Sequence, residues 1–510
     1  MQSNSQIQVL IVGAGPTGLT LACDLARRGI EFRILEKAAA HFVGSRAKGL
    51  QPRTLEVFDD LGVIETALSS GSPYPRLHAY LWRFVLGWSM HKHKKPTSEV
   101  PYPNTWMVPQ WRTEEILRAK VAEYGHQVEL GSEAVAIEQH AGGVKATISH
   151  SDGTREQISA DYLIGADGGH SFVRKASGVS FEGETCEGQR MLIADVRADG
   201  LDRRYWHVWP KAKGRAVAFC PLPGSDKFQF TAQISDGAPL PDLSENGLQD
   251  FFHAAVPSVT KIRLTDPSWV SIYRPSARMV SRYRIGRVFL AGDAAHVHPP
   301  TGGQGLNTGI QDAYNLGWKL AQVLKGAPEA LLDTYEEERL PVAAHVLGIA
   351  SRLHRQAMQH NLRKQRRGAK TQQLALNYRG CRLSRDERDA KAKICAGDRA
   401  PDALCHTTEG ASIRLFDLFR GPQFTLLAFS PPPDWDLTCA RCCCSLIDTD
   451  EHAHRAYEAH ENTFVLVRPD GYIGLATLSP ASLKRYLEDT VRGSTNVLDV
   501  SLVTICLKHR

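Results

Sequence analysis

Apolar and polar positions at the start of the chain predict a strand, a helix and a second strand. The apolar run Val9–Val12 leads into a glycine-rich turn, a helical pattern continues to Arg28, and a second apolar run covers Phe32–Leu35. Short continuous apolar runs bounded by turn residues are typical of buried parallel strands. The pattern therefore predicts a βαβ unit whose turn has the sequence Gly13-Ala14-Gly15-Pro16-Thr17-Gly18.

The periodicity changes along the next part of the chain. Residues 71–104 are rich in Pro, Tyr and Trp and have no helical period, whereas a helix is expected over Gln110–Tyr124, followed by alternating strands up to Leu163. Between Gly183 and Arg274, short strands are separated by Gly, Pro and Asp turns, which is typical of an antiparallel sheet. Residues 285–350 return to the first domain. We therefore expect an α/β fold: a Rossmann-like domain with an inserted, mostly antiparallel β-sheet domain.

The last part of the chain predicts a separate unit. A long, charged helical stretch runs from Tyr335 to about Lys393, and a new pattern begins at Gly397. This pattern consists of a strand over Phe424–Phe429, a helix, a strand over Phe464–Val467, a turn, a third strand and a helix to Leu487. The order of these elements resembles a thioredoxin-like fold.

Composition and charge exclude several classes of protein. A net charge of +6 over 510 residues is small, so it supports no nucleic-acid partner. No apolar run approaches the length of a membrane span, and the residues before Ile7 carry no apolar signal segment. The eleven cysteines lack the spacing of a disulfide framework, which indicates reduced thiols. We therefore expect a cytoplasmic protein without membrane contact.

The glycine turn has the spacing of a dinucleotide-binding loop. Its first glycine permits the tight turn, its second lets the backbone approach a pyrophosphate, and its third lets helix and strand pack. The helix N-terminus favours phosphate charge, and an acid after the second strand suits ribose hydroxyls. No second loop of this type with flanking strand and helix follows, so the chain has one dinucleotide fold. The cofactor-binding candidates here are Gly13, Gly15, Pro16, Thr17, Gly18, Glu36 and Lys37.

Two further motifs follow this unit. The first is an apolar run that ends in Asp167-Gly168, and the second runs from Arg287 to Asn307. In the latter, Val288–Ala291 is expected to be a buried strand leading to Asp293, and a carboxylate at such a strand end is more often a ligand or cap than core. A glycine-rich loop then opens a helix predicted over Gly305–Trp318, whose first N–H groups would attract an anion.

Together, the three motifs resemble the single-component FAD-dependent aromatic hydroxylases, which have the para-hydroxybenzoate hydroxylase fold. The longer form with a thioredoxin-like tail, found among polyketide and phenol hydroxylases, is the most similar. The resemblance covers about residues 7–350 and, less strongly, Gly397–Leu487. It implies an FAD-binding domain over residues 1–72, 105–182 and 275–350, a substrate-binding domain over 73–104 and 183–274, linker helices over 351–395 and a thioredoxin-like domain over 396–510.

The resemblance also implies roles for single residues. Glu36 would bind the adenosine ribose, Arg46 the FAD pyrophosphate and the nicotinamide donor, and Gln110 the flavin. The pair Asp167-Gly168 resembles a motif associated with both FAD and NAD(P)H, and Asp293 the aspartate that binds the ribityl chain. The candidates near the ring are Gly305, the backbone N–H groups of Leu306 and Asn307 as donors to the flavin pyrimidine, and the carbonyl of Pro300 beside the substrate hydroxyl.

The implied activity is hydroxylation of a phenolic, aromatic or polyketide substrate with O2, through a flavin C4a-hydroperoxide. FAD would be the bound cofactor and NADPH or NADH a transient co-substrate, with Arg46 and Pro300 as the catalytic residues. The tryptophans of the inserted domain are core residues by default, although some could line a flat aromatic pocket. We expect no metal ion and keep a homodimer open.

Two other classes of function stay open. One is a flavoenzyme of the same fold that does not hydroxylate a ring, such as a reductase or a Baeyer–Villiger-type oxygenase. The other is a non-catalytic FAD-binding assembly protein that uses its tail for interaction.

A cysteine cluster in the tail is the remaining candidate site. Cys439 and Cys442 have thioredoxin spacing, and Cys443 and Cys444 follow, but the run Pro431–Pro433 lies between them and the preceding strand. Active thioredoxins place the pair at the helix start, where the dipole lowers the thiol pKa. We therefore expect an inert cluster that packs or supports assembly.

Overall fold

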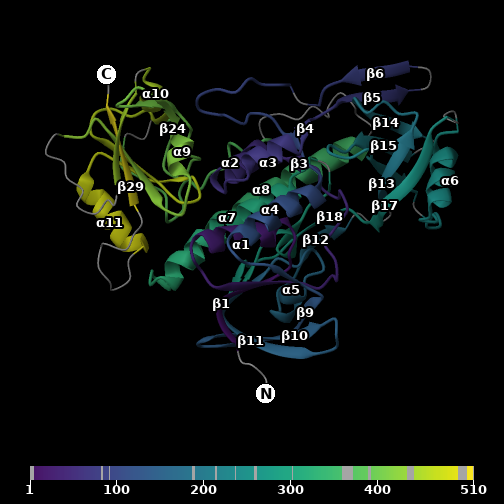
Figure 1. Cartoon of the computed structure of the whole chain (residues 1–510), viewed down its shortest axis with the longest axis horizontal. Coiled ribbons are helices and arrows are strands. Elements are labelled where there is room, and N and C mark those ends of the chain that lie inside the picture. The colour runs from purple at the N-terminus through teal and green to yellow at the C-terminus, as the bar shows by residue number, and fades with distance from the viewer. Residues whose placement is uncertain are drawn as a thin grey trace.

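The computed structural model describes residues 5–81, 84–90, 92–185, 190–212, 215–235, 237–257, 261–300, 302–358, 371–388, 392–432, 442–448, 450–491 and 502–508. The chain forms a central α/β half with a second β-sheet on one side and a C-terminal unit on the other (Figure 1). No helix of the described residues is long and apolar enough to cross a membrane.

The central sheet has the parallel order expected of a Rossmann-like domain. Along the main path its strands follow the order β19-β20-β11-β1-β2-β8, and β10 and β9 extend it from β11. Strand β1 pairs in parallel with both β2 and β11, and β20 pairs in parallel with β11. The strands are β1 (Ser5–Val12), β2 (Phe32–Glu36), β8 (Val128–Leu130), β9 (Ser132–His140), β10 (Gly143–His150), β11 (Arg155–Gly165), β19 (Arg284–Ile285) and β20 (Val288–Leu290).

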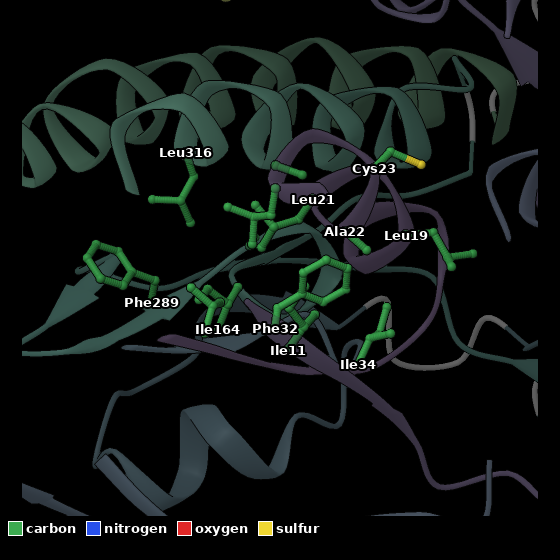
Figure 2. Close-up of a cluster of buried hydrophobic side chains, with 14 of the residues drawn as sticks. Ile11, Leu19, Leu21, Ala22, Cys23, Phe32, Ile34, Ile164, Phe289 and Leu316 are labelled. Carbon is green, nitrogen blue, oxygen red and sulfur yellow. The ribbon is translucent and has the colours of Figure 1, made fainter. Parts of the chain in front are cut away.

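Helices cover this sheet through a continuous apolar core. Figure 2 shows Leu21 of α1 and Leu316 of α7 above Ile11, Ile164 and Phe289 of the strands. Burial of such side chains contributes about 1.5–3 kcal/mol each. The helices of this half are α1 (Pro16–Arg27), α2 (Pro52–Asp60), α3 (Ile64–Ser69), α4 (Gln110–Glu123), α5 (Phe172–Ala176), α7 (Gly305–Leu324) and α8 (Asp333–Met358), with 3-10 turns η1 (Gly292–Ala294) and η2 (Glu329–Leu332).

The inserted sheet has seven strands in the order β17-β13-β16-β15-β14-β5-β6. Most neighbours are antiparallel, but β14 and β5 are parallel. Helix α6 (Glu245–Ala255) covers one face with Leu248 and Phe252. The strands are β5 (Arg76–Leu81), β6 (Phe84–Trp88), β13 (Arg190–Asp199), β14 (Tyr205–Ala212), β15 (Arg215–Pro221), β16 (Phe228–Ile234) and β17 (Arg263–Tyr273).

Two small three-stranded sheets lie beside the central sheet and the inserted sheet. One has the order β3-β7-β4 and the other β12-β18-β21. Their strands are β3 (Gly49–Leu50), β4 (Ser72–Pro73), β7 (Trp106–Met107), β12 (Glu182–Thr185), β18 (Ser276–Met279) and β21 (His296–Val297).

The C-terminal unit is an eight-stranded sheet with the order β22-β28-β27-β25-β29-β26-β23-β24. Its strands are β22 (Arg385–Asp386), β23 (Leu404–Thr407), β24 (Ser412–Arg414), β25 (Phe424–Phe429), β26 (Cys442–Ile447), β27 (Thr463–Val467), β28 (Ile473–Thr477) and β29 (Leu502–Lys508). Its helices are α9 (Leu415–Phe419), α10 (His452–Tyr457) and α11 (Pro480–Val491).

One expectation for this region was wrong, and two strands were not predicted. The helix predicted from Tyr335 to Lys393 is present as α8, which is described as far as Met358, but residues 372–388 form turns and strand β22 instead of a helix. Gln373 of this segment is buried and accepts a hydrogen bond from Gln311 of α7, which charge and periodicity did not reveal. Strands β26 and β29 were not predicted, and β29 lies between β25 and β26 with parallel pairing to both.

Candidate flavin site

The glycine loop between β1 and α1 has the geometry that a pyrophosphate needs. Gly13 has φ +105°, and a Cβ there would lie 2.4 Å from the carbonyl oxygen of Ala166. A Cβ on Gly18 would lie 2.0 Å from the carbonyl oxygen of Gly13, whereas one on Gly15 would meet nothing within 4 Å. The first and third glycines are therefore required by close packing, and the second faces open space beside the start of α1.

Glu36 at the end of β2 lies beside this loop. Its carboxylate accepts hydrogen bonds from the backbone N–H groups of Ala14, at 3.2 Å, and Ala38, at 3.0 Å. A carboxylate has acceptor positions beyond these two, so Glu36 can also bind hydroxyl groups. The neighbouring Lys37 is exposed.

The third motif packs directly on the first. Gly292 has φ +60°, and a Cβ on either Gly292 or Gly309 of α7 would lie 2.4 Å from Thr17 Oγ1 at the start of α1. Asp293 is half-buried and has no hydrogen-bond or ion-pair partner among the described residues. Its Oδ1 lies 3.9 Å from the position of a Cβ on Gly305, so its carboxylate is next to the N-terminus of α7.

Asp312 of α7 holds the third motif in place. It is fully buried, and it accepts hydrogen bonds from the Gly292 N–H at 3.1 Å and from Arg339 Nε at 2.8 Å, with His296 Nε2 at 2.6 Å. Burial would raise the pKa of Asp312, but the charges of Arg339 and His296 hold it below its ordinary value. His296 therefore belongs to this buried network, and the described residues contain no cluster that could hold a metal ion.

The loop that carries Arg46 is clamped to the inserted sheet. Ser45 donates from its N–H and its hydroxyl to the carboxylate of Asp195, at 2.7 and 2.5 Å, and Gln229 Nε2 donates to the Ser45 carbonyl at 2.9 Å. The Arg46 side chain is exposed and close to the phenol of Tyr273, whose pKa burial raises to about 12 against the opposing charge of Arg46. Sequence reasoning missed Asp195 and Gln229, because only strand pairing places them side by side.

Gln110 fixes the same loop from the other side. Its N–H donates to the Ala47 carbonyl at 2.8 Å, its Oε1 accepts from the Ala47 N–H at 3.2 Å, and its Nε2 donates to Glu114 at 2.9 Å. Burial raises the pKa of Glu114 to about 7, although the Gln110 bond and Arg118 oppose this. Gln110 therefore positions the Arg46 loop.

The Asn307 side chain ties the start of α7 to strand β3. It accepts the Gln51 N–H at 2.7 Å and donates to the carbonyls of Gly49 and Gly303, at 2.8 and 2.9 Å. The first N–H groups of a helix have no partner within the helix, so those of residues 305–307 can donate to a ligand. The exposed Pro300 accepts the Gly303 N–H at 3.3 Å, which leaves one lone pair on its carbonyl.

Asp167 lies just before α5, and its expected association with FAD and NAD(P)H stays a prediction. Its carboxylate accepts the Ser171 hydroxyl at 2.5 Å and the N–H groups of Phe172 and Val173 at 2.7 and 3.1 Å, so it caps α5. Gly168 follows with φ +79°. This motif supports the glycine loop through the backbone of Ala166, which contacts Gly13.

Two protein families match the chain. The FAD binding domain family matches residues 6–350, and the aromatic-ring hydroxylase C-terminal family matches residues 393–493. A flavin-dependent monooxygenase of Mycobacteroides abscessus is 46% identical over 507 residues, which cover 95% of this chain and 100% of the relative. The chain belongs to the flavin-dependent monooxygenases. The predicted family and the FAD cofactor are therefore confirmed, and the non-catalytic alternative is not.

Two further similarities concern this monooxygenase. Pentachlorophenol 4-monooxygenase of Sphingobium chlorophenolicum is 34% identical over 445 residues, covering 82% of this chain and 79% of the relative. The solved structure of aklavinone-11 hydroxylase, a ternary complex with FAD and aklavinone, superposes with a TM-score of 0.80 at 26% identity, covering 96% of this chain and 100% of that one. The predicted fold class is thereby confirmed.

One face of the inserted sheet of the monooxygenase points away from α6 towards the Arg46 loop. Trp206 lies on this face, with the Lys48 ammonium 4.9 Å from its ring centre and Tyr74 6.1 Å away. The indole nitrogen of Trp206 is buried and has no hydrogen-bond partner in the part of the chain that the structure describes. Trp209, on the opposite face, packs on Phe252 of α6 and is core.

The described part of the cysteine cluster of the monooxygenase lies in a strand. Cys442 and Cys444 belong to strand β26, which pairs in parallel with β29, and Cys439 lies outside the described residues. A strand supplies no helix dipole to lower a thiol pKa. The expectation of an inert cluster stays a prediction.

Proposed function

We propose that this monooxygenase hydroxylates a phenolic or polycyclic aromatic ring, with NADPH or NADH as electron donor. The observation that carries the proposal is the junction at Ser45–Lys48. This loop joins the flavin half to the sheet face that carries Trp206 and Tyr273. An aromatic substrate on that face would lie between the flavin loops and the inserted sheet.

The residues present fit FAD. The glycine loop and the start of α1 would hold the pyrophosphate, Glu36 the adenosine ribose, and Asp293, which has no protein partner among the described residues, the ribityl hydroxyls. The N–H groups at the start of α7 would stabilise negative charge on the reduced ring. When bound, FAD supplies the activation of O2 and the transfer of one oxygen atom.

The residues of the chain would orient and polarise the substrate. A phenol has a pKa of about 10, so an acceptor for its proton makes the ring more electron-rich at neutral pH. The remaining lone pair of the Pro300 carbonyl is such an acceptor. Water would be excluded in part by Trp269, because a Cβ on Gly44 would lie 2.4 Å from its Cδ2 atom.

The substrate class is also supported by similarity to two enzymes. One is named for pentachlorophenol, which is a phenol, and the other is a hydroxylase whose structure contains bound aklavinone. Arg46 is the proposed contact for the nicotinamide donor, because its guanidinium is exposed at the same junction. A cation at this position would attract the phosphates of the donor.

The test uses the FAD-loaded protein, either nicotinamide donor and a panel of phenols and polyketides under oxygen-18 gas. We expect a subset of phenols to accelerate donor oxidation and to gain one labelled oxygen as a ring hydroxyl. Label found only in hydrogen peroxide with every compound would overturn the proposal. Label found in an ester or lactone made from a ketone would instead support the Baeyer–Villiger alternative.

A further inference from the structure

A buried polar segment far along the chain contacts the loop that opens α7. Thr371, Gln372 and Gln373, here called the glutamine strap, are 4%, 6% and 2% exposed. The strap lies after α8 and outside the region that the glycine motifs define. Such burial of amide side chains requires hydrogen bonds, so their partners show what the strap does.

Gln373 binds three side chains of α7 and its loop. Its Oε1 accepts Gln311 Nε2 at 2.6 Å, and its Nε2 donates to Gln304 Oε1 at 2.8 Å and more weakly to Thr308 Oγ1 at 3.3 Å. Gln304 then donates to the carbonyls of Gly302, at 2.8 Å, and Thr371, at 3.1 Å. A continuous chain of amides therefore joins α7, the strap and residues 302–304.

The backbone at both ends of this chain of bonds needs support. Gln373 has φ +61°, a conformation that residues with a side chain rarely adopt. Gly302 and Gly303 have φ +111° and +62°, so their own conformational preferences do not fix the loop. The side chain of Gln304 is therefore a main constraint on the loop, and Gln373 holds that side chain.

We propose that Gln373 is a positioning residue for the flavin site. It keeps residues 302–304 in the arrangement in which the Pro300 carbonyl and the N–H groups at the start of α7 face the same space. The inference rests on the proposed function, because this loop would help to couple oxygen transfer to oxidation of the nicotinamide donor. Gln373 itself touches neither FAD nor substrate.

The neighbouring Gln372 provides a matched control. It is as buried as Gln373, but its Nε2 donates to the Pro103 carbonyl at 2.7 Å and its Oε1 accepts Lys94 Nζ at 2.9 Å. These contacts point to the segment before α4, away from the α7 loop. Gln372→Ala therefore removes a comparable number of buried bonds without touching Gln304.

The first measurement is hydrogen–deuterium exchange of residues 302–308 in the FAD-loaded protein, which needs neither donor nor substrate. We expect Gln373→Ala to exchange there at least several-fold faster than the wild type, and Gln372→Ala to exchange like the wild type. Gln373→Gly, which relieves the left-handed backbone, should behave like Gln373→Ala. Exchange that is unchanged in Gln373→Ala, or equally fast in both alanine variants, would overturn the proposal.

The second measurement is the ratio of hydrogen peroxide formed to NAD(P)H oxidised. This ratio should rise at least twofold in Gln373→Ala and should not rise in Gln372→Ala. An unchanged ratio in Gln373→Ala would overturn the positioning role. If Gln373→Ala does not fold, Gln373→Asn, which tolerates the backbone conformation, replaces it with the same expectations. A wild type that no aromatic compound stimulates would count against the proposed function alone, because the exchange measurement still decides the role of Gln373.

Discussion

Replacing Arg468 with Met should loosen the C-terminal unit from the flavin half. Arg468 is fully buried and donates to both oxygens of Glu338 on α8, at 2.5 and 2.9 Å, and to both oxygens of Asp470, at 3.0 and 2.5 Å. Lys319 on α7 completes the group with its ammonium 2.7 Å from Glu338. Two cations and two carboxylates thus neutralise one another away from water.

The magnitude follows from what the substitution leaves behind. Met is similar in volume but uncharged, so Glu338 and Asp470 would share Lys319 as their remaining cation in a buried group with a net negative charge. Removing one partner of a buried ion pair costs about 3–5 kcal/mol. A whole domain is stable by only about 5–15 kcal/mol, so this loss should be large enough to measure.

The loss should also depend on pH. Burial would raise the pKa of Glu338, but the charges of Arg468 and Lys319 hold it well below its ordinary value. A depressed carboxyl pKa stabilises the folded state above the unfolded pKa, and this contribution disappears as the pH falls towards the folded pKa. The difference in stability between the wild type and Arg468→Met should therefore be greatest near neutral pH and shrink in acid.

Urea unfolding, followed by flavin fluorescence and by proteolysis of the C-terminal unit, measures the effect. The matched control is Arg385→Met, because Arg385 pairs with Asp489 at 2.7 Å with 37% and 47% of the side chains exposed, and its loss should cost at most about 1 kcal/mol. Adding Glu338→Gln to Arg468→Met restores neutrality and should recover part of the loss. Equal urea midpoints for the two arginine variants, or a deeper loss in the double variant, would refute the reasoning.

Three further predictions concern the flavin site. Gly18→Ala should abolish FAD binding and lower the melting temperature, because the new Cβ would lie 2.0 Å from the Gly13 carbonyl oxygen. Gly15→Ala should weaken FAD binding without lowering the melting temperature. Flavin absorbance and thermal unfolding distinguish the two variants. Burial raises the pKa of Glu114 to about 7. The free energy of unfolding therefore falls as the pH rises from the unfolded pKa of this carboxyl to about 7, because the folded state disfavours the ionised form. Glu114→Gln should thus stabilise the protein above pH 7 by up to about 3 kcal/mol and leave it unchanged in acid, and equal urea midpoints at pH 8 would contradict this. Arg46→Ala should slow flavin reduction by the nicotinamide far more than it weakens phenol binding, and stopped-flow reduction at the wild-type rate would exclude this role.

Local elements were predicted well because their signals are local. Strand β25 has the predicted bounds, and α4 and α7 begin at the predicted Gln110 and Gly305. The apolar period and the turn residues set these elements within a few positions. The glycine loop was recognised for the same reason, since the spacing of its glycines lies within one βαβ unit.

Strand order and long-range hydrogen bonds could not be obtained in this way. Nothing near Asp195 or Gln229 in the chain indicates that strand pairing brings them to Ser45, and the carboxylate of Asp167 could not be seen to cap α5. The C-terminal pattern failed at β29, because a strand inserted between β25 and β26 is defined by its partners and not by its own period.

The amino-acid sequence by itself therefore determined the glycine loop, the acid after β2 and the helix that begins at Gly305. Through these features it also determined the family. The folded structure decided how these parts are held: Gln373 against Gln304, Asp312 against His296 and Arg339, and Arg468 between Glu338 and Asp470. The physical reason is that buried polar groups must find partners. A partner can lie 417 residues away, as Asp470 does from Arg53, and it is chosen by packing, which no local pattern records.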